Sequence, residues 1–519
     1  MILSDEGIRN AGQWEAKGYI IPGYDRNKMR EETIAHPEWV HFGAGNIFRA
    51  FHAAAAQKLL STGDMTGGIA VVEGYDTEII DRIYRPYDDL SILVTLRSDG
   101  SVVKEVIGSV GQSCILDESN EEEIEKIREI FRAPSLKMAT FTITEKGYVH
   151  FGKKVADLMY ERYLAGAYPI ALVSTDNCSH NGDILKESIL RFARDGEESG
   201  RYNKGFCEYL IDEEKVSFPW SMIDKITPRP DEDVRRILAD DGMENAGCIR
   251  TSKDTFTAPF VNAEESEYMV IEDDFPAGRP PLEKAGFIFT DRDTVDRVER
   301  MKVCTCLNPL HTSLAVFGCL LGYTKISDEM KDDDLNRLVI RIGYEEGLPV
   351  VTDPKVIDPR EFIDTVIRER IPNPFMPDTP QRIATDTSQK LPIRFGQTIK
   401  NYMELGKNTD DLKMIPLVFA GWIRYLMAVD DNGEEFEPSP DPLLDKVCGY
   451  VKNIRLGGDK EALCDIKPLL CDASLFGVDL YEAGIADRVT QYLTELIAGK
   501  GAVRKTLKKY VNQCDTGRI

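Results

Sequence analysis

Short apolar runs alternate with helical stretches over the first half of the chain. Residues 38–42 and 68–73 are apolar runs of strand length. Between them lie the turn Gly43-Ala44-Gly45 and the alanine-rich stretch 46–60, which has helical character. A strand, a glycine turn, a helix and a second strand form a βαβ unit. The pattern therefore predicts an α/β fold with a parallel, Rossmann-type sheet.

Further apolar runs extend this sheet, and a different pattern follows it. Four more runs have strand length: residues 90–96, 138–143, 170–174 and 268–272. Later in the chain, amphipathic stretches such as 332–346 and 482–497 predict helices. The Pro- and Gly-rich stretch 275–281 is typical of a linker. We expect a Rossmann-type dinucleotide-binding domain with extensions over residues 1–285 and a mainly α-helical domain over residues 286–519.

Composition and charge narrow the expected partners. The 64 basic and 88 acidic residues of the 519-residue chain give a formal net charge of -24, which repels nucleic acid. No apolar stretch reaches the ~20 residues of a spanning helix, and no signal peptide is visible. The 11 scattered cysteines favour reduced thiols over a disulfide framework. We expect a cytoplasmic protein that binds a small molecule, with no membrane partner, as a monomer or small homo-oligomer.

The turn after the first strand carries part of a dinucleotide fingerprint. Gly43 allows a tight turn, and Gly45 allows a pyrophosphate to approach the backbone at a helix N-terminus. Phe48 stands where the fingerprint has a small residue, so a simple βα turn explains the pattern almost as well. We expect Gly43, Gly45, Asn46 and Phe48 to form part of a cofactor site.

Two carboxylates follow the second strand of this unit. Glu73 ends the strand, and Asp76 is close behind it. An acid at this place accepts hydrogen bonds from the ribose hydroxyls and disfavours a 2′-phosphate, which favours NAD over NADP. The alternative for either residue alone is a solvated loop carboxylate.

The stretch 300–311 brings a lysine, an asparagine and a histidine into otherwise apolar surroundings. Lys302 can act as a general base, and Asn308 and His311 can donate hydrogen bonds to an alkoxide. The alternatives are a lysine that reaches solvent, an asparagine that caps a helix before proline, and a histidine satisfied in the core. Cys304 and Cys306 do not have the spacing of a structural zinc site, so we expect no metal.

Six segments in order resemble the polyol-specific long-chain dehydrogenase/reductase family. They are HFGAGNIFRA (41–50), TITEKGY (142–148), STDNCSHNG (174–182), DKITP (224–228), KVCTCLNPLH (302–311) and DTPQRIATDTSQKLP (378–392). The resemblance implies a Rossmann-type domain, a mainly helical domain and an active site in a cleft between them. It implies that Lys302 is the general base and that Asn308 and His311 bind the reacting oxygen. Glu299 stands three residues before Lys302, so on a helix it can lie on the same face and relay the proton to solvent.

The same resemblance implies a substrate site and a reaction. Four residues are expected to contact the substrate: Asn177, Asp224, Arg382 and Lys390. The bases Lys225 and Arg229 add to these, so a carboxylate can be held. We expect NAD-dependent interconversion of D-mannonate and D-fructuronate. Mannitol with fructose, and altronate with tagaturonate, remain alternatives within the family. An NAD-dependent glycosidase and a non-catalytic NAD sensor are more remote ones.

The spacing of the central motif departs from the family pattern. Five residues separate Lys302 from Asn308, whereas four are usual. On an ideal α-helix this places Lys302 and His311 about 180° apart, on opposite faces. The assignment therefore requires an irregular backbone, either a π-bulge or a break at Asn308-Pro309.

Overall fold

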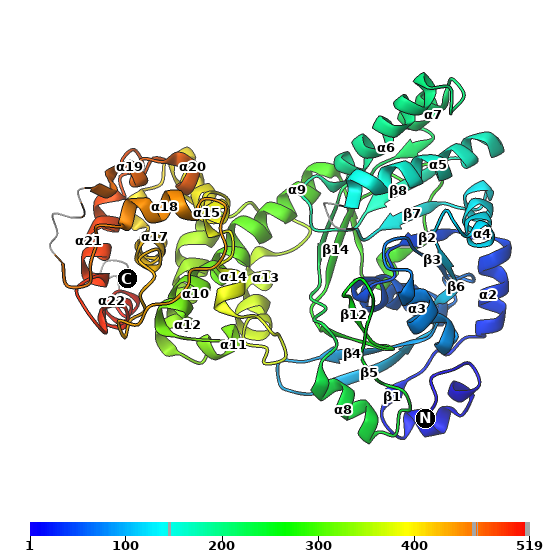
Figure 1. Cartoon of the computed structure of the whole chain (residues 1–519), viewed down its shortest axis with the longest axis horizontal. Coiled ribbons are helices and arrows are strands. Elements are labelled where there is room, and N and C mark those ends of the chain that lie inside the picture. The colour runs from blue at the N-terminus through cyan, green and yellow to red at the C-terminus, as the bar shows by residue number, and fades with distance from the viewer. Residues whose placement is uncertain (144–146, 459–462, 464, 514–519) are drawn as a thin grey trace. The chain divides into compact units, whose positions relative to one another are not determined.

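The chain folds into two compact units, Met1–Asp296 and Arg297–Ile519. The computed structural model describes the chain except for residues 144–146, 459–462, 464 and 514–519 (Figure 1). Part of the segment TITEKGY therefore lies outside the described residues.

The first unit is built on a parallel sheet of six strands. In sheet order they are β6 (Val110–Ile115), β3 (Ile69–Glu73), β2 (Trp39–Phe42), β7 (Met138–Phe141), β8 (Ile170–Ser174) and β9 (Val216–Ser217). Every neighbouring pair is parallel. Numbered along the chain within this sheet, the order is 3-2-1-4-5-6, which is the doubly wound order of dinucleotide-binding domains. The predicted fold class is confirmed.

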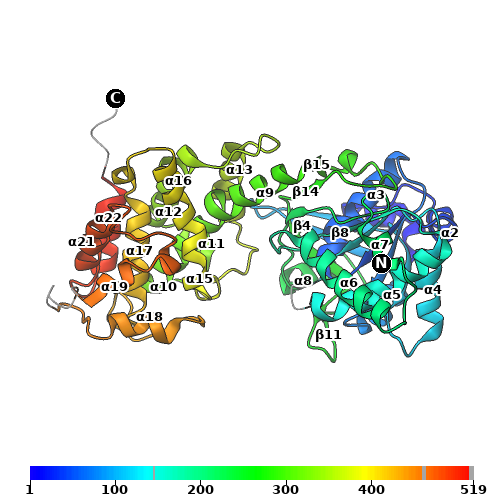
Figure 2. The same ribbon diagram turned by 90° about the horizontal axis from the view of Figure 1, so that it is seen from above.

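Alternate residues of the strands face two different cores. Val40, Phe42, Ala70 and Val72 pack with helices on one face of the sheet. These helices lie side by side (Figure 2): α4 (Glu121–Arg132), α5 (Tyr148–Gly166) and α6 (Asn181–Glu198). Successive side chains of a pleated strand point to opposite faces of the sheet, so every second residue belongs to the same core. Because both faces of this sheet are buried, the sequence of each strand is a continuous apolar run.

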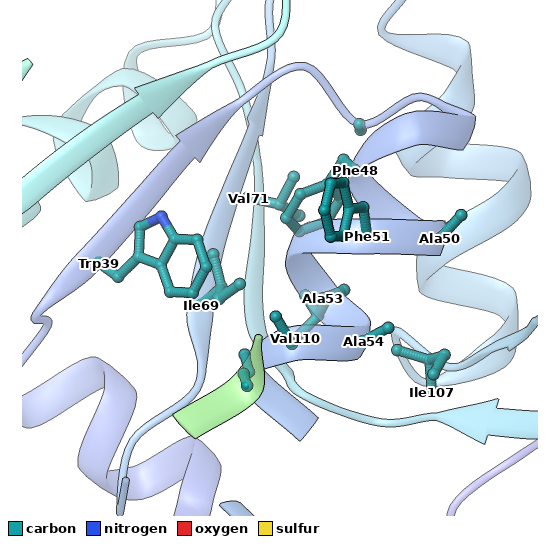
Figure 3. Packing of buried hydrophobic residues seen from close by; sticks show 14 of the residues in the cluster. Trp39, Phe48, Ala50, Phe51, Ala53, Ala54, Ile69, Val71, Ile107 and Val110 are labelled. Atoms are coloured by element: carbon teal, nitrogen blue, oxygen red, sulfur yellow. The ribbon is translucent and has the colours of Figure 1, made fainter. Parts of the chain in front are cut away.

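The other face of the sheet packs against the helical segment after the glycine turn. Trp39, Ile69 and Val71 of the strands gather with Phe48 and Ala53 of that segment (Figure 3). The segment consists of a π-helical stretch, Phe48–His52, and helix α3 (Ala53–Thr62). Small alanine side chains allow this helix to approach the sheet closely.

Smaller sheets and helices complete the first unit. One sheet has the order β1 (Tyr19–Ile20), β5 (Val102–Ile107), β4 (Ser91–Leu96), β13 (Phe260–Glu264). Another has the order β10 (Ser221–Asp224), β14 (Tyr268–Glu272), β15 (Ile288–Thr290), and β11 (Ile249–Arg250) pairs with β12 (Phe256–Thr257). The remaining helices are α1 (Ala11–Glu15), α2 (Arg26–Ala35), α7 (Phe206–Ile211) and α8 (Glu232–Asp240).

The stretch expected to be a linker is a packed turn. The Arg279 guanidinium lies 3.4 Å from the centre of the Phe289 ring and forms ion pairs with Asp273 and Glu283. The chain then continues into β15, which pairs with β14. Proline and glycine here belong to a packed connection between the parallel strands β14 and β15, so the linker interpretation was wrong. The domain division near residue 285 stays a prediction.

The second unit is helical in its described residues. Its longer helices begin with the end of α9 (Arg292–Met301) and continue as α10 (Asn308–Leu321), α12 (Asp333–Ile340), α16 (Gln397–Glu404), α17 (Met414–Tyr425), α18 (Leu444–Val451), α21 (Ala486–Leu496) and α22 (Ala502–Val511). The shorter ones are α11 (Ile326–Glu329), α13 (Pro359–Thr365), α14 (Pro380–Ile383), α15 (Thr387–Leu391), α19 (Lys467–Leu470) and α20 (Ala473–Phe476).

A long apolar helical run lies inside the fold. The run Arg292–Leu321 reaches a mean hydropathy of 1.4 over 18 residues, and 83% of that window is buried. By length and composition it could cross a membrane, but the core helix of a globular protein has the same properties. Helix α17 is buried along its whole length.

Several helices contain π-helical turns. Four of them lie in the second unit, at Lys302–Cys306 (η7), Arg341–Gly347 (η8), Val366–Arg370 (η10) and Pro392–Gly396 (η11). The predicted helices 46–60 and 332–346 are therefore helical but not uniformly α-helical. A π turn holds one extra residue per turn, which a hydrophobic period alone does not show.

Candidate active site

The glycine turn after β2 combines a strained position with an open one. Gly43 has a φ of 111°, and a Cβ atom there would lie 2.6 Å from the Thr142 carbonyl oxygen. A Cβ atom on Gly45 would meet no atom within 4 Å. Gly43 is therefore needed for the turn itself, whereas the space above Gly45 can admit a ligand.

Glu73 is tied to this turn by backbone hydrogen bonds. Its Oε2 accepts from the Ala44 N–H at 2.8 Å, and its Oε1 accepts from the N–H groups of Tyr75 and Asp76 at 2.8 and 3.0 Å. The Asp76 carboxylate accepts from the Thr251 hydroxyl at 2.6 Å. Both carboxylates are buried, so neither is the solvated loop residue considered as an alternative. Their contact with a ribose stays a prediction.

Asn46 and Phe48 are held in different ways. The Asn46 Oδ1 accepts from the buried guanidinium of Arg49 at 2.8 Å, and Arg49 also donates to the Ala258 carbonyl. The Phe48 ring is fully buried and stacks on His41 with ring centres 4.4 Å apart. Phe48 thus packs the helical segment on the sheet, and any contact of Phe48 with a cofactor would be through its backbone.

A buried polar network fixes the loop after β8. The hydroxyls of Tyr148 and Ser174 both donate to the Asp176 carboxylate, which also accepts from the Cys178 N–H at 2.7 Å. The Asn181 amide donates to the Ser174 carbonyl at 3.3 Å. Asn177 lies at the exposed tip of this loop, and the described residues give its side chain no hydrogen-bond partner. Its amide is therefore available to a ligand.

The segment with Asp224 and two bases is mostly internal. Asp224 ends β10 and is buried. The Lys225 side chain is only 3% exposed and pairs with Glu267 at 2.8 Å, while the Arg229 guanidinium lies over the Phe256 ring. Lys225 thus has a carboxylate partner within the fold and is a poor candidate for binding a substrate carboxylate.

The backbone between Lys302 and Asn308 is irregular, as the spacing requires. Residues Lys302–Cys306 form a π-helical turn, in which the Leu307 N–H donates to the Lys302 carbonyl at 3.1 Å. Leu307 then leaves the helical region, with φ -129° and ψ -62°, and α10 begins at Asn308. The predicted irregularity is confirmed, and it combines both forms, a π turn and a new helix start.

The three candidate catalytic side chains flank this junction, with Lys302 before it and Asn308 and His311 after it. Lys302, Asn308 and His311 are each half-buried. The described residues offer the Asn308 side-chain amide no hydrogen-bond partner, so it does not cap a helix as the alternative requires. Met301 is helical, with φ -55° and ψ -50°, so Glu299 lies one turn before Lys302 in a continuous helix.

The neighbouring cysteine Cys306 is an internal thiol. Cys306 is buried with its Sγ 3.7 Å from the Pro359 carbonyl oxygen, and burial raises the pKa of its thiol. Over the described part of the chain, no three His, Cys, Asp or Glu side chains group in a way that could hold a metal ion.

Three basic side chains of the second unit influence one another. Burial, and then the charge of Arg394, lower the pKa of Lys390 to about 8, and Arg382 adds to this effect. Arg382 is largely exposed and paired with Asp378. The Lys390 ammonium donates to the carbonyl oxygens of Ile383, at 3.0 Å, and Thr385.

Arg394 was not predicted from the sequence. It lies in the π-helical turn Pro392–Gly396, and its Nη1 donates to the Thr312 hydroxyl at 2.6 Å. The sequence contained a sign of its role, because a basic residue four positions after Lys390 lies on the same face of a helix. The segment used for the resemblance ended two residues before it.

Comparison with known proteins gives consistent matches along the chain. The model for the mannitol dehydrogenase Rossmann domain matches residues 37–284, and that for the mannitol dehydrogenase C-terminal domain matches residues 294–497. The D-mannonate oxidoreductase of Thermotoga maritima is 49% identical, with 99% of this chain and 100% of that protein covered. A mannitol 2-dehydrogenase of Aspergillus fumigatus is 28% identical, with 97% and 98% covered.

Two solved structures share the fold. One is D-sorbitol dehydrogenase in substrate-free form. Its TM-score is 0.78 at 22% sequence identity, and the match covers 98% of this chain and 100% of that one. The other is Pseudomonas fluorescens mannitol 2-dehydrogenase in a ternary complex with NAD and D-mannitol, with a TM-score of 0.68, 24% identity and coverage of 99% and 100%.

Proposed function

Because the chain belongs to the mannitol dehydrogenase family, we propose that it is an NAD-dependent oxidoreductase that interconverts D-mannonate and D-fructuronate. The observation that carries this choice is the 49% identity to a D-mannonate oxidoreductase over the full length of both chains. Mannitol 2-dehydrogenases are the runner-up, and they match at 28% identity. The basic side chains of the second unit also favour a sugar acid over a neutral polyol.

Residues of α9, of the π turn Lys302–Cys306 and of the start of α10 are proposed to carry the chemistry. The Lys302 amine takes the proton from the substrate hydroxyl, and Glu299 passes it on to solvent. The free amide of Asn308 and the His311 imidazole bind the oxygen as charge develops on it. NAD, when bound, supplies the hydride acceptor for this oxidation. Asn177, Asp224, Arg382 and Lys390 are proposed to contact the substrate.

The glycine turn is suited to NAD. The open space above Gly45 is where a pyrophosphate could approach the backbone, and Gly43, Asn46 and the backbone of Phe48 shape the same turn. Glu73 at the end of β3 and Asp76 shortly after it place two carboxylates here, which would repel the 2′-phosphate of NADP. We also propose a cytoplasmic location, which the nine free cysteines described in the fold support.

Replacing Gly45 by alanine should weaken NADH binding without unfolding the protein. A methyl group there meets no protein atom within 4 Å, but it fills the space proposed for the pyrophosphate. We expect the dissociation constant for NADH, measured by fluorescence titration, to rise about tenfold or more, a cost of at least 1.4 kcal/mol. An unchanged dissociation constant would place the pyrophosphate elsewhere.

The matched control is Gly43→Ala. At a φ of 111° and 2.6 Å from the Thr142 oxygen, the added methyl group strains the folded state. We expect a loss of about 3 kcal/mol in the free energy of unfolding. Thermal unfolding of the two variants should therefore separate a ligand effect at Gly45 from a folding effect at Gly43.

The substrate is tested by NADH oxidation with D-fructuronate, D-tagaturonate and D-fructose side by side. We expect the highest kcat/KM with D-fructuronate. A clear preference for D-fructose would replace the proposal with a mannitol 2-dehydrogenase activity, and a preference for D-tagaturonate would replace it with a tagaturonate reductase activity.

A further inference from the structure

Arg394 differs from Arg382 and Lys390 because its recorded hydrogen bonds involve only one of its three side-chain nitrogens. Its Nη1 donates to the Thr312 hydroxyl at 2.6 Å and lies 3.4 Å from the Asn308 carbonyl oxygen. These two contacts use one nitrogen of the guanidinium. Among the described residues, no carboxylate pairs with Arg394 and no acceptor lies on Nε or Nη2.

The two remaining nitrogens are accessible. The buried nitrogen and oxygen atoms without a partner include Nε of Arg30, Arg49 and Arg424, but no atom of Arg394. The side chain as a whole is half-buried. Nε and Nη2 of an arginine form a planar fork that matches a carboxylate, so this edge of Arg394 has the geometry of an anion receptor.

The charge of Arg394 is also unbalanced within its surroundings. Burial lowers its pKa to about 10, which still leaves the guanidinium charged at neutral pH. A partly desolvated cation without a counter-ion raises the free energy of the site, and a bound anion would remove that cost. Arg382 and Lys390 lack this property, because one is paired with Asp378 and the other donates to two carbonyl oxygens.

We propose that Arg394 binds the carboxylate of the substrate through Nε and Nη2 and thereby selects a sugar acid over a neutral polyol. The inference rests on the proposed function. Thr312 holds the guanidinium through Nη1, and Asn308, whose carbonyl oxygen is next to the same nitrogen, carries the amide proposed to bind the reacting oxygen. One small substrate can therefore contact both residues.

The test measures binding without turnover. D-mannonate and D-mannitol are titrated by calorimetry into the enzyme saturated with NADH, in which neither alcohol can be oxidised. We expect the native enzyme to bind D-mannonate more tightly. In Arg394→Met the dissociation constant for D-mannonate should rise about 30- to 1000-fold, as for loss of one partner of a charged pair. That for D-mannitol should change less than about threefold.

Two variants separate recognition from a structural role. Arg394→Lys keeps the charge but loses the fork, so it should restore only part of the affinity for D-mannonate. Thr312→Val removes the hydroxyl that holds Nη1, so it should weaken D-mannonate by a smaller factor than Arg394→Met does and change the affinity for D-mannitol little. If Arg394→Met weakens both ligands equally, or leaves the affinity for D-mannonate unchanged, Arg394 is not the carboxylate receptor.

The outcomes for the two proposals can be told apart. If the native enzyme prefers D-mannitol to D-mannonate, the proposed substrate is wrong and the inference falls with it. If the native enzyme prefers D-mannonate and Arg394→Met keeps that preference, only the role of Arg394 is wrong. Reduction of D-fructose by the same variants gives a second comparison, which should follow the titrations with D-mannitol.

Discussion

Replacing Lys302 by alanine is expected to lower kcat about 10²- to 10⁴-fold while NADH still binds, because a positioned general base contributes that much to proton transfer. Lys302 begins the π-helical turn and is half-buried, so its removal leaves the sheet and the glycine turn intact. Pre-steady-state reduction of D-fructuronate by the NADH complex measures the effect on the chemical step.

Two controls test whether the loss of kcat is due to the missing Lys302 amine. Lys331→Ala removes an exposed lysine of the second unit that pairs with Asp328, and it should keep native turnover. Adding methylamine to Lys302→Ala should recover part of the lost rate, because a small amine can take the place of the missing base. Near-native turnover of Lys302→Ala would remove Lys302 from the mechanism.

Replacing Glu329 by glutamine should stabilise the protein increasingly as the pH rises. Glu329 ends α11, is fully buried, and neither of its carboxyl oxygens has a hydrogen-bond partner among the described residues. It packs on Gly318 of α10, where an added Cβ would lie 2.1 Å from Oε1. Burial, and then the nearby charge of Asp332, raise the pKa of Glu329 to about 9.

The direction of the effect follows from proton binding. Between pH 4.5 and about 9 the folded chain keeps the Glu329 proton, whereas the unfolded chain loses it. The free energy of unfolding therefore falls with rising pH, by about 1.4 kcal/mol per unit, or about 3 kcal/mol at pH 7. Glutamine has no proton to lose, so its advantage should be small near pH 4.5 and large at pH 8.

Calorimetric unfolding of native protein and Glu329→Gln at pH 5, 6.5 and 8 tests this expectation. The exposed Glu404 at the end of α16 provides the control, because Glu404→Gln should shift the unfolding temperature little and equally at every pH. A difference between native protein and Glu329→Gln that does not grow with pH would mean that Glu329 is ionised in the fold.

The Rossmann sheet could be predicted because its strands are buried on both faces. Runs such as 170–174 are uniformly apolar and end at polar residues, and the structure places β8 at Ile170–Ser174. Residues 288–290, which lie after the Pro- and Gly-rich turn, were not recognised as a strand. They form β15, but the run is short and its side chains are only half-buried.

The candidate site was predictable in its residue types and less so in its contacts. The count between Lys302 and Asn308 was sufficient to require an irregular backbone. It could not show that a π turn and a helix start would both occur. Nor could the sequence show that Lys225 pairs with Glu267, because these residues lie far apart in the chain. Partners of this kind depend on tertiary packing.

The π turn at Lys302–Cys306 means that the orientation of the lysine depends on chain length as well as on side-chain identity. Each residue added to or removed from a helix rotates everything before it by about 100° relative to everything after it. Deleting a residue from a regular α-helical part of this run would therefore turn Lys302 away from its present direction. Deleting Val303 is different, because a π turn that loses its extra residue can become an α turn, and the flanking helices can keep their register. The π turn is thus the place in this run where chain length can change by one residue without reorienting the lysine, which a scan of point substitutions would not show.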